Sequence, residues 1–131
     1  MSKVLIVAEH LNGRLNLSAT AKTVSAARAF SPAQIDVLVL SDAPEAIAAE
    51  AAKIEGVNEV LSVAHPANAH PVAAVLAPQI ARAAEGYSHV FGPSTTFGKD
   101  LMPCVAALLG VAQVSDVMAI GLLHGLRELG L

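Results

Sequence analysis

The residues of this chain that come closest to known chemistry lie in one loop, residues 92–100, which reads GPSTTFGKD. In a Walker A phosphate loop, four residues separate the two glycines, and a serine or threonine follows the lysine because its hydroxyl ligands magnesium. Here five residues separate Gly92 from Gly98, and Asp100 follows the lysine in place of a hydroxyl residue. Because a carboxylate at that position repels phosphate, the sequence argues against a nucleoside triphosphatase.

The same loop keeps the features of a simpler anion site. Its hydroxyl residues Ser94, Thr95 and Thr96 stand before a predicted helix, and the free amides at a helix N-terminus attract anions. These hydroxyls are also the residue types that cap helices. We favour capping, and we carry the loop forward as a candidate anion-binding site of Ser94, Thr95, Thr96, Gly98 and Lys99.

Other catalytic and cofactor patterns are missing from the sequence. The first predicted strand is followed by EHLNGRLN, which has one glycine where a dinucleotide-binding turn needs three. The five histidines show no pairing at ligand spacing, so we expect no metal site. The single cysteine, Cys104, lies in the apolar segment MPCVAALLG and is predicted to be a buried, inert thiol. We therefore predict no catalytic residue.

Alternating strand and helix signals place these residues in an α/β fold. Residues 3–8 (KVLIVA) form a continuous apolar run rich in β-branched side chains, which is typical of a strand buried on both faces of a parallel sheet. The predicted strands are residues 3–8, 35–40, 57–63, 89–91 and 111–120, and the predicted helices are residues 17–30, 44–54, 71–84 and 98–109. We expect Ser18 to cap the first helix, Ser41 and Asp42 to cap the second, and Pro78 to kink the third or delay its start.

A doubly wound sheet follows from this alternation, because crossovers of this length form right-handed βαβ units. We predict a three-layer α/β/α fold with a mainly parallel sheet of about five strands in the order 3-2-1-4-5, which puts the most apolar strands in the centre. Ligands of such folds bind at the carboxyl ends of the strands, beside the switch point between strands one and four. Residues 8–12 and 92–99 are then expected on the same rim of the sheet.

The composition limits the partners and the compartment. The 131 residues fit one domain, and a net charge of −3 without a basic run argues against nucleic acid as a partner. The N-terminal apolar run is too short for a signal peptide, and no apolar stretch is long enough to cross a membrane, so the cytoplasm is the expected compartment. Charged residues make up only 15% of the chain. This indicates either that another chain covers part of the surface or that the protein is alanine-rich because its genome has a high GC content.

Two stretches resemble electron-transfer flavoprotein α subunits. They are the opening VLIVAEHLNGRL and the longer GPSTTFGKDLMPCVAALLGVAQVSDVMAI, and the resemblance runs through residues 3–120. It implies an adenine-nucleotide-hydrolase-like N-terminal domain that pairs with a β subunit, while a C-terminal domain holds most of the contacts to FAD. It also implies a heterodimer that carries electrons from dehydrogenases to a membrane quinone reductase.

Residues 121–131 do not resemble that family, so we expect a family domain at 1–120 and a non-family tail at 121–131. A truncation, a frame shift and a fragment are the alternative origins of this tail. The expected function is a scaffold and subunit-docking domain without FAD of its own, which makes the chain part of an electron carrier and not an enzyme. The alternative is a stand-alone adenine-nucleotide-binding domain similar to universal stress proteins. Because later strands of the family are missing, we also expect the edge strand at 111–120 to pair two copies of the chain into a homodimer.

Overall fold

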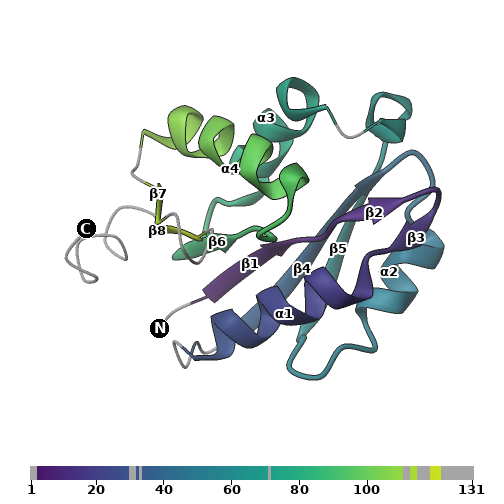
Figure 1. The fold of residues 1–131 in the computed structure, drawn as a ribbon, viewed down its shortest axis with the longest axis horizontal. Helices are drawn as coiled ribbons and strands as arrows, with labels where there is room; N and C mark the ends of the chain where they lie inside the picture. The colour runs from purple at the N-terminus through teal and green to yellow at the C-terminus, as the bar shows by residue number, and fades with distance from the viewer. Residues whose placement is uncertain are drawn as a thin grey trace.

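The computed structural model of the chain describes residues 3–29, 32, 34–70, 72–110, 113–114 and 119–121. Within these residues the central sheet has six strands in the order β5-β4-β1-β6-β8-β7 (Figure 1). The strands are β1 (Lys3–Val7), β4 (Gln34–Ser41), β5 (Glu59–Ala64), β6 (His89–Phe91), β7 (Gln113–Val114) and β8 (Ala119–Gly121). A separate hairpin of β2 (His10–Leu11) and β3 (Arg14–Leu15) follows β1. The helices are α1 (Leu17–Arg28), α2 (Glu45–Ala51), α3 (Ala73–Ala83) and α4 (Thr96–Leu109), with a 3₁₀ turn at η1 (Pro66–Ala69).

The strands β5, β4, β1 and β6 are parallel and form the centre of the molecule. Strand β1 pairs with β4 from Lys3 opposite Gln34 onward, and with β6 from Val4 opposite His89 onward. Its central position explains its continuous apolar sequence, since helices cover both faces of the sheet (Figure 1). The predicted three-layer α/β/α fold is confirmed, with β1, β4, β5 and β6 as strands one to four of the predicted order.

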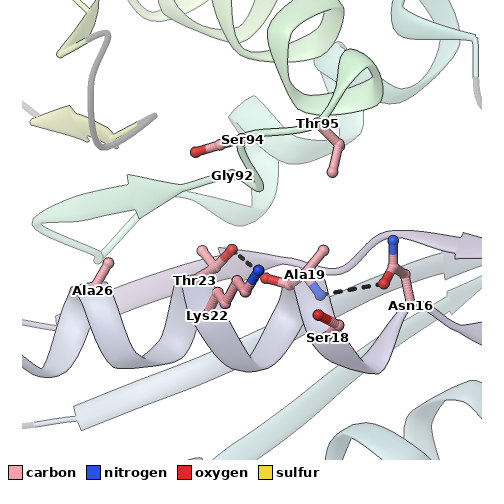
Figure 2. A pocket seen from close by; sticks show the side chains of 9 residues that line it. All are labelled: Asn16, Ser18, Ala19, Lys22, Thr23, Ala26, Gly92, Ser94 and Thr95. Atoms are coloured by element: carbon pink, nitrogen blue, oxygen red, sulfur yellow. Dashed lines mark hydrogen bonds between the residues drawn. The ribbon is translucent and has the colours of Figure 1, made fainter.

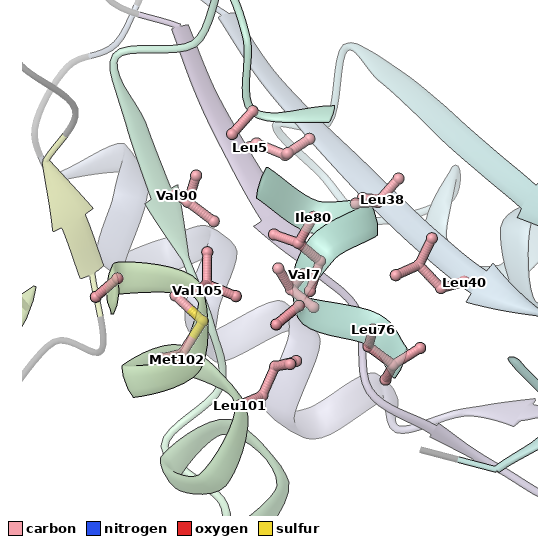
Figure 3. Close-up of a cluster of buried hydrophobic side chains, with 13 residues drawn as sticks. Leu5, Val7, Leu38, Leu40, Leu76, Ile80, Val90, Leu101, Met102 and Val105 are labelled. Atoms are coloured by element: carbon pink, nitrogen blue, oxygen red, sulfur yellow. The ribbon is translucent and has the colours of Figure 1, made fainter. Parts of the chain in front are cut away.

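Side chains of β1 alternate between two hydrophobic cores, one on each face of the sheet. Val4 and Ile6 belong to the core beneath α1 and α2. Leu5 and Val7 belong to the core beneath α3 and α4, where Met102 and its neighbours on α4 complete the packing (Figure 3). Full burial of such a side chain stabilises the fold by about 1.5–3 kcal/mol, so the two cores together hold the rims of the sheet in place.

The predicted fifth strand at 111–120 is wrong as a single parallel strand. The described parts of this stretch are β7 and β8, which are antiparallel to each other, and β8 is also antiparallel to β6. Residues 111–112 and 115–118 of the predicted strand lie outside the described residues.

Two helix caps differ from the prediction. Asn16, not Ser18, caps α1, because its Oδ1 accepts a hydrogen bond from the amide of Ala19 at 3.2 Å. Helix α2 begins after Pro44 without a side-chain cap, since Ser41 Oγ instead accepts from the amide of Ala43 in the preceding turn.

The remaining helix boundaries are close to the predicted ones. Helix α3 contains Pro78 in its interior and begins two residues after its predicted start. Helix α4 begins at Thr96, two residues before its own predicted start. The predicted end of the first helix, Phe30, and the predicted start of the third, Pro71, lie outside the described residues. None of the helices that the structure describes is both long and apolar enough to cross a membrane.

Candidate functional site

A polar groove lies at the carboxyl-terminal rim of the sheet, beside the switch point between β1 and β6. We call it the switch-point groove. It has a volume of about 370 Å³, and it is bounded on one side by α1 and on the other by the loop between β6 and α4 (Figure 2). The lining residues are Asn16, Ser18, Ala19, Lys22, Thr23, Ala26, Gly92, Ser94 and Thr95.

The chain reaches the groove through a tight turn that the sequence encodes. After β1, the hairpin β2–β3 reverses at Asn12 and Gly13, which have positive φ values of 53° and 75°. Asparagine followed by glycine is the preferred pair for such a turn. The hairpin returns the chain to Asn16, whose amide donates to the carbonyl of Glu9 at 2.8 Å, and α1 therefore begins directly beside the end of β1.

The groove contains one positive side chain and no carboxylate among its lining residues. Lys22 is exposed on α1, four residues after Ser18 and so on the same face of the helix. Ser94 and Thr95 lie on the opposite side of the groove (Figure 2). Thr23 is buried, and its Oγ1 already donates to the carbonyl of Ala19 at 2.8 Å. The arrangement favours a small anionic group over a cation.

The structure brings two of the five predicted anion-site residues to this groove. Ser94 and Thr95 line it, whereas Thr96, Gly98 and Lys99 are not among its lining residues. Lys99 is exposed on the first turn of α4, and its amide donates to the carbonyl of Thr95. The positive charge of the groove therefore comes from α1 and not from the predicted lysine. Whether an anion binds there stays a prediction.

The favoured explanation of the loop hydroxyls, helix capping, holds for Thr95. Thr95 is the N-cap of α4, and its Oγ1 accepts from the amide of Gly98 at 3.4 Å. It also donates to Glu9 Oε2 at 3.1 Å. The capping hydroxyl thus connects the start of α4 to the end of β1.

Gly98 serves close packing inside the loop. A Cβ placed on it would lie 1.7 Å from the carbonyl oxygen of Pro93, a separation that no side chain can tolerate. In phosphate-binding turns, the equivalent space lets the backbone approach a pyrophosphate. Here the carbonyl of Pro93 takes the space beside Gly98.

Sequence reasoning missed Asn16, Ser18 and Lys22 as neighbours of the loop. A signal was available, because the switch-point rule places the helix after the first strand opposite the loop after the fourth. The cap of α1 and the residues one turn into it were therefore predictable as the facing wall. The expected order of strands placed residues 8–12 and 92–99 on the rim, and the helix after the first strand was not included in that rim.

The prediction of a buried Cys104 is wrong. Cys104 is exposed on α4, with its sulfur 3.5 Å from the carbonyl oxygen of Asp100. The buried face of α4 is formed by Leu101, Met102 and Val105, and position 104 falls outside this stripe because side chains on one helix face recur every three to four residues. An apolar segment is not uniformly buried when only one face meets the core. Among the described residues, no cluster of histidine, cysteine and carboxylate side chains could hold a metal ion.

A second polar cluster lies at the opposite, amino-terminal edge of the sheet. The carboxylate of Asp36, which is 1% exposed, accepts from the Tyr87 hydroxyl at 2.6 Å and from Gln34 Nε2 at 3.0 and 2.9 Å. Burial raises the pKa of the Tyr87 hydroxyl, and its hydrogen bond to Asp36 together with the negative charges of Asp36 and Glu59 raises that pKa further. Lys3 Nζ lies 4.9 Å from the centre of the Tyr87 ring. This cluster is far from the switch-point rim, and its donors are all used internally.

Comparison with known proteins agrees with the fold. The family model described as "Electron transfer flavoprotein domain" matches residues 4–125, and the domain boundary predicted at residue 120 stays a prediction. The electron transfer flavoprotein subunits alpha of Pseudomonas aeruginosa and Paracoccus denitrificans are each 44% identical to the chain over 117 residues, which cover 89% of this chain and 37% of each relative. The mitochondrial subunit alpha of Dictyostelium discoideum is 36% identical over 123 residues, covering 88% of this chain and 34% of that protein.

The chain thus spans little more than a third of the length of these relatives. The matched residues include β1, the loop that holds Glu9 and the whole of the switch-point groove. The predicted resemblance is confirmed, and the chain belongs to the electron transfer flavoprotein family, with α subunits as its relatives.

Proposed function

We propose that this chain is the N-terminal scaffold and subunit-docking part of an electron transfer flavoprotein α subunit. The observation that carries the proposal is the family match over residues 4–125, together with 44% identity to two α subunits. In this proposal the partner is the electron transfer flavoprotein β subunit, and the complete heterodimer carries electrons from dehydrogenases by means of FAD. The chain itself has no catalytic role, and its compartment in a bacterial cell is the cytoplasm.

The surface supports a docking role. Charged residues make up 15% of the sequence, below the usual quarter for a domain that is covered by water alone. Several large apolar side chains are exposed in the described part of the chain, and Leu11 and Leu108 are the most exposed of them, at 70% and 57%. Only a contiguous apolar patch marks an interface, so Leu11 and Leu108 serve here as positions at which a docking face can be tested.

The proposal further states that the chain binds no FAD of its own. The close packing of Pro93 against Gly98 supports this, because it removes the backbone space that a pyrophosphate needs.

Coexpression with the β subunit of Pseudomonas aeruginosa tests the proposal. We expect a one-to-one complex on gel filtration with light scattering, without the visible absorbance of a flavin on the isolated chain. The variants Leu11→Ser and Leu108→Ser, on different elements, should differ in how far they weaken the complex and so map the docking face. Absence of a complex at tens of micromolar would contradict the docking role, and flavin that co-elutes with the chain alone would contradict the cofactor statement.

A stand-alone adenine-nucleotide-binding domain remains the second candidate. The lysine and hydroxyls of the switch-point groove, without a lining carboxylate, favour it. A ligand that binds the folded chain raises its Tm by mass action, so thermal unfolding with millimolar AMP or phosphate separates the two functions. A rise in Tm that is lost in Lys22→Ala but kept in Lys99→Ala would support nucleotide binding in the groove. We expect no rise in Tm, because the carboxylate of Glu9, which follows β1, already accepts hydrogen bonds from Asn16 and Thr95.

The homodimer predicted at residues 111–120 is retained as a proposal. In the described part of the sheet, β7 is the outermost strand on this side, so Gln113 and Val114 form its edge. Unpaired strand edges favour pairing with another chain. Light scattering across a hundredfold range of concentration tests this, and a monomeric mass throughout would contradict it.

A further inference from the structure

The carboxylate of Glu9 occupies a distinctive position at the switch point. Glu9 follows β1 and is half-buried. Its Oε1 accepts from Asn16 Nδ2 at 2.8 Å, and its Oε2 accepts from Thr95 Oγ1 at 3.1 Å. These two donors are the N-caps of α1 and α4, which line the switch-point groove from opposite sides (Figure 2).

Both caps are used twice, and Glu9 fixes the direction of each. Asn16 Oδ1 accepts from the amide of Ala19 while its Nδ2 donates to Glu9. Thr95 Oγ1 accepts from the amide of Gly98 while its only hydroxyl hydrogen goes to Glu9. The N-terminus of each helix, which carries a partial positive charge, is therefore linked through its capping side chain to the same carboxylate.

We infer that the Glu9 carboxylate is a built-in anion that takes the position where other doubly wound domains hold a ligand's phosphate. In such folds the phosphate lies at a helix N-terminus beside the switch point and receives hydrogen bonds from that terminus. Here two helix N-termini direct their side-chain donors to a carboxylate of the chain itself. A phosphate at this place would meet a negative charge, and it would find the Thr95 hydroxyl hydrogen and one Nδ2 hydrogen of Asn16 already used. Glu9 is thus a specificity-determining residue, and what it excludes is the phosphate group of a nucleotide.

The loop geometry agrees with this inference independently. The carbonyl oxygen of Pro93 approaches Gly98 so closely that no Cβ fits between them. A second acceptor of the chain therefore lies against the first turn of α4. The anion-attracting end of this helix is served by the hydroxyl of Thr95 and faced by groups of partial or full negative charge. This inference goes beyond the docking proposal and does not depend on it, because it concerns an internal contact of the isolated domain.

Chemical rescue of a Glu9 variant tests the inference on the full 131-residue chain. Glu9→Ala removes the carboxylate and leaves both cap donors without an acceptor, and we expect it to lower the Tm by about 5–10 °C. Sodium formate or sodium phosphate at tens of millimolar should recover a third or more of this loss, because an external anion can take the vacated position. Sodium chloride at equal ionic strength should recover none, and the wild-type Tm should respond to the three salts alike.

Glu85→Ala is the matched control, since Glu85 is an exposed glutamate of the turn after α3 and no hydrogen bond of its side chain is found among the described residues. It should have a Tm close to that of the wild type and show no selective response to formate or phosphate. The inference is overturned if Glu9→Ala melts like Glu85→Ala, or if its loss is not recovered by formate or phosphate beyond chloride. A selective rise of the wild-type Tm with phosphate or AMP also overturns it.

Should Glu9→Ala fail to fold, Glu9→Gln decides the question. A glutamine keeps the size of the side chain, but its amide group places a donor against one of the two cap donors. We expect hydrogen exchange at the amides of Ala19 and Gly98 to become at least several-fold faster than in the wild type, while exchange at Val37 in the central strand β4 stays the same. Unchanged exchange at Ala19 and Gly98 would contradict the inference.

Discussion

Two carboxylates at opposite ends of the sheet are held in different ways. Asp36, at the amino-terminal edge, is 1% exposed and receives hydrogen bonds from Tyr87 and Gln34. Glu9, at the carboxyl-terminal rim, is half-buried and receives hydrogen bonds from the caps of two helices. The first joins the start of β4 to Tyr87, two residues before β6, and serves stability. The Glu9 cluster lies at the rim where folds of this kind bind ligands. In our inference its hydrogen bonds to the two helix caps exclude a phosphate from that place.

The comparison also separates the costs of breaking each cluster. A buried carboxylate that loses a donor keeps its desolvation penalty without compensation, whereas a half-buried carboxylate can turn to water. We therefore expect changes around Asp36 to lower the free energy of unfolding more than equivalent changes at Glu9. Changes at the rim should instead alter the response to anions.

The largest effect on the free energy of unfolding is expected from Gly98→Ala, which disturbs the backbone at the carboxyl-terminal rim of the sheet. The new Cβ would lie 1.7 Å from the Pro93 carbonyl oxygen, so the loop or the first turn of α4 must move. We expect a loss of about 3 kcal/mol or more in the free energy of unfolding, or failure to fold. Gly92→Ala is the comparison in the same loop, because the three atoms nearest to its Cβ belong to the side chain of the buried Met102 and not to the backbone. Urea unfolding that gave equal losses for both variants would contradict the structural role of Gly98.

Sequence reasoning reached the central sheet and stopped short of the contacts that shape its rim. The continuous apolar run of β1 and the spacing of the crossovers predict the parallel strands, because burial on both faces leaves few alternatives. The contacts of Glu9 could not be predicted from local sequence, since its partners Asn16 and Thr95 lie 7 and 86 residues away. Which of two neighbouring polar residues caps a helix depends on where its first turn begins, and that is set by the hairpin and not by local preference.

The next effect in size is expected at the opposite edge of the sheet. Tyr87→Phe removes the hydroxyl that donates to the buried Asp36 at 2.6 Å. We expect a loss of about 2–3 kcal/mol, because the carboxylate remains buried with Gln34 Nε2 as its other donor. A double-mutant cycle with Asp36→Asn, followed by urea unfolding, measures the coupling of the pair. A coupling energy near zero would show that the hydroxyl acts through packing alone.

Glu9→Gln is expected to cost less, about 1 kcal/mol, because its carboxylate is half-buried and one of the two hydrogen bonds can persist. This prediction sharpens the comparison, since the same urea experiment is applied to both ends of the sheet. The ratio to Tyr87→Phe matters more than either value. If Glu9→Gln were the more damaging variant, the rim cluster would be the main stabilising contact and the contrast drawn between the two carboxylates would be reversed.

The smallest effect at neutral pH, and the most specific, concerns the titration of Tyr87. Burial first, and then Asp36, raises the pKa of its hydroxyl above the ordinary value of about 10. The unfolded chain therefore releases this proton at lower pH than the folded chain does, so the stabilisation is complete below about pH 10 and declines as the pH rises beyond it.

Tyr87 is the only tyrosine of the chain, and tyrosinate absorbance consequently reports on this one group. In an alkaline titration we expect that absorbance to appear together with the loss of far-ultraviolet circular dichroism, and we expect Tyr87→Phe to have a flatter dependence of stability on pH above 10 than the wild type. Tyrosinate that formed near pH 10 in a chain with native circular dichroism would mean that the hydroxyl is accessible and that Asp36 does not hold it.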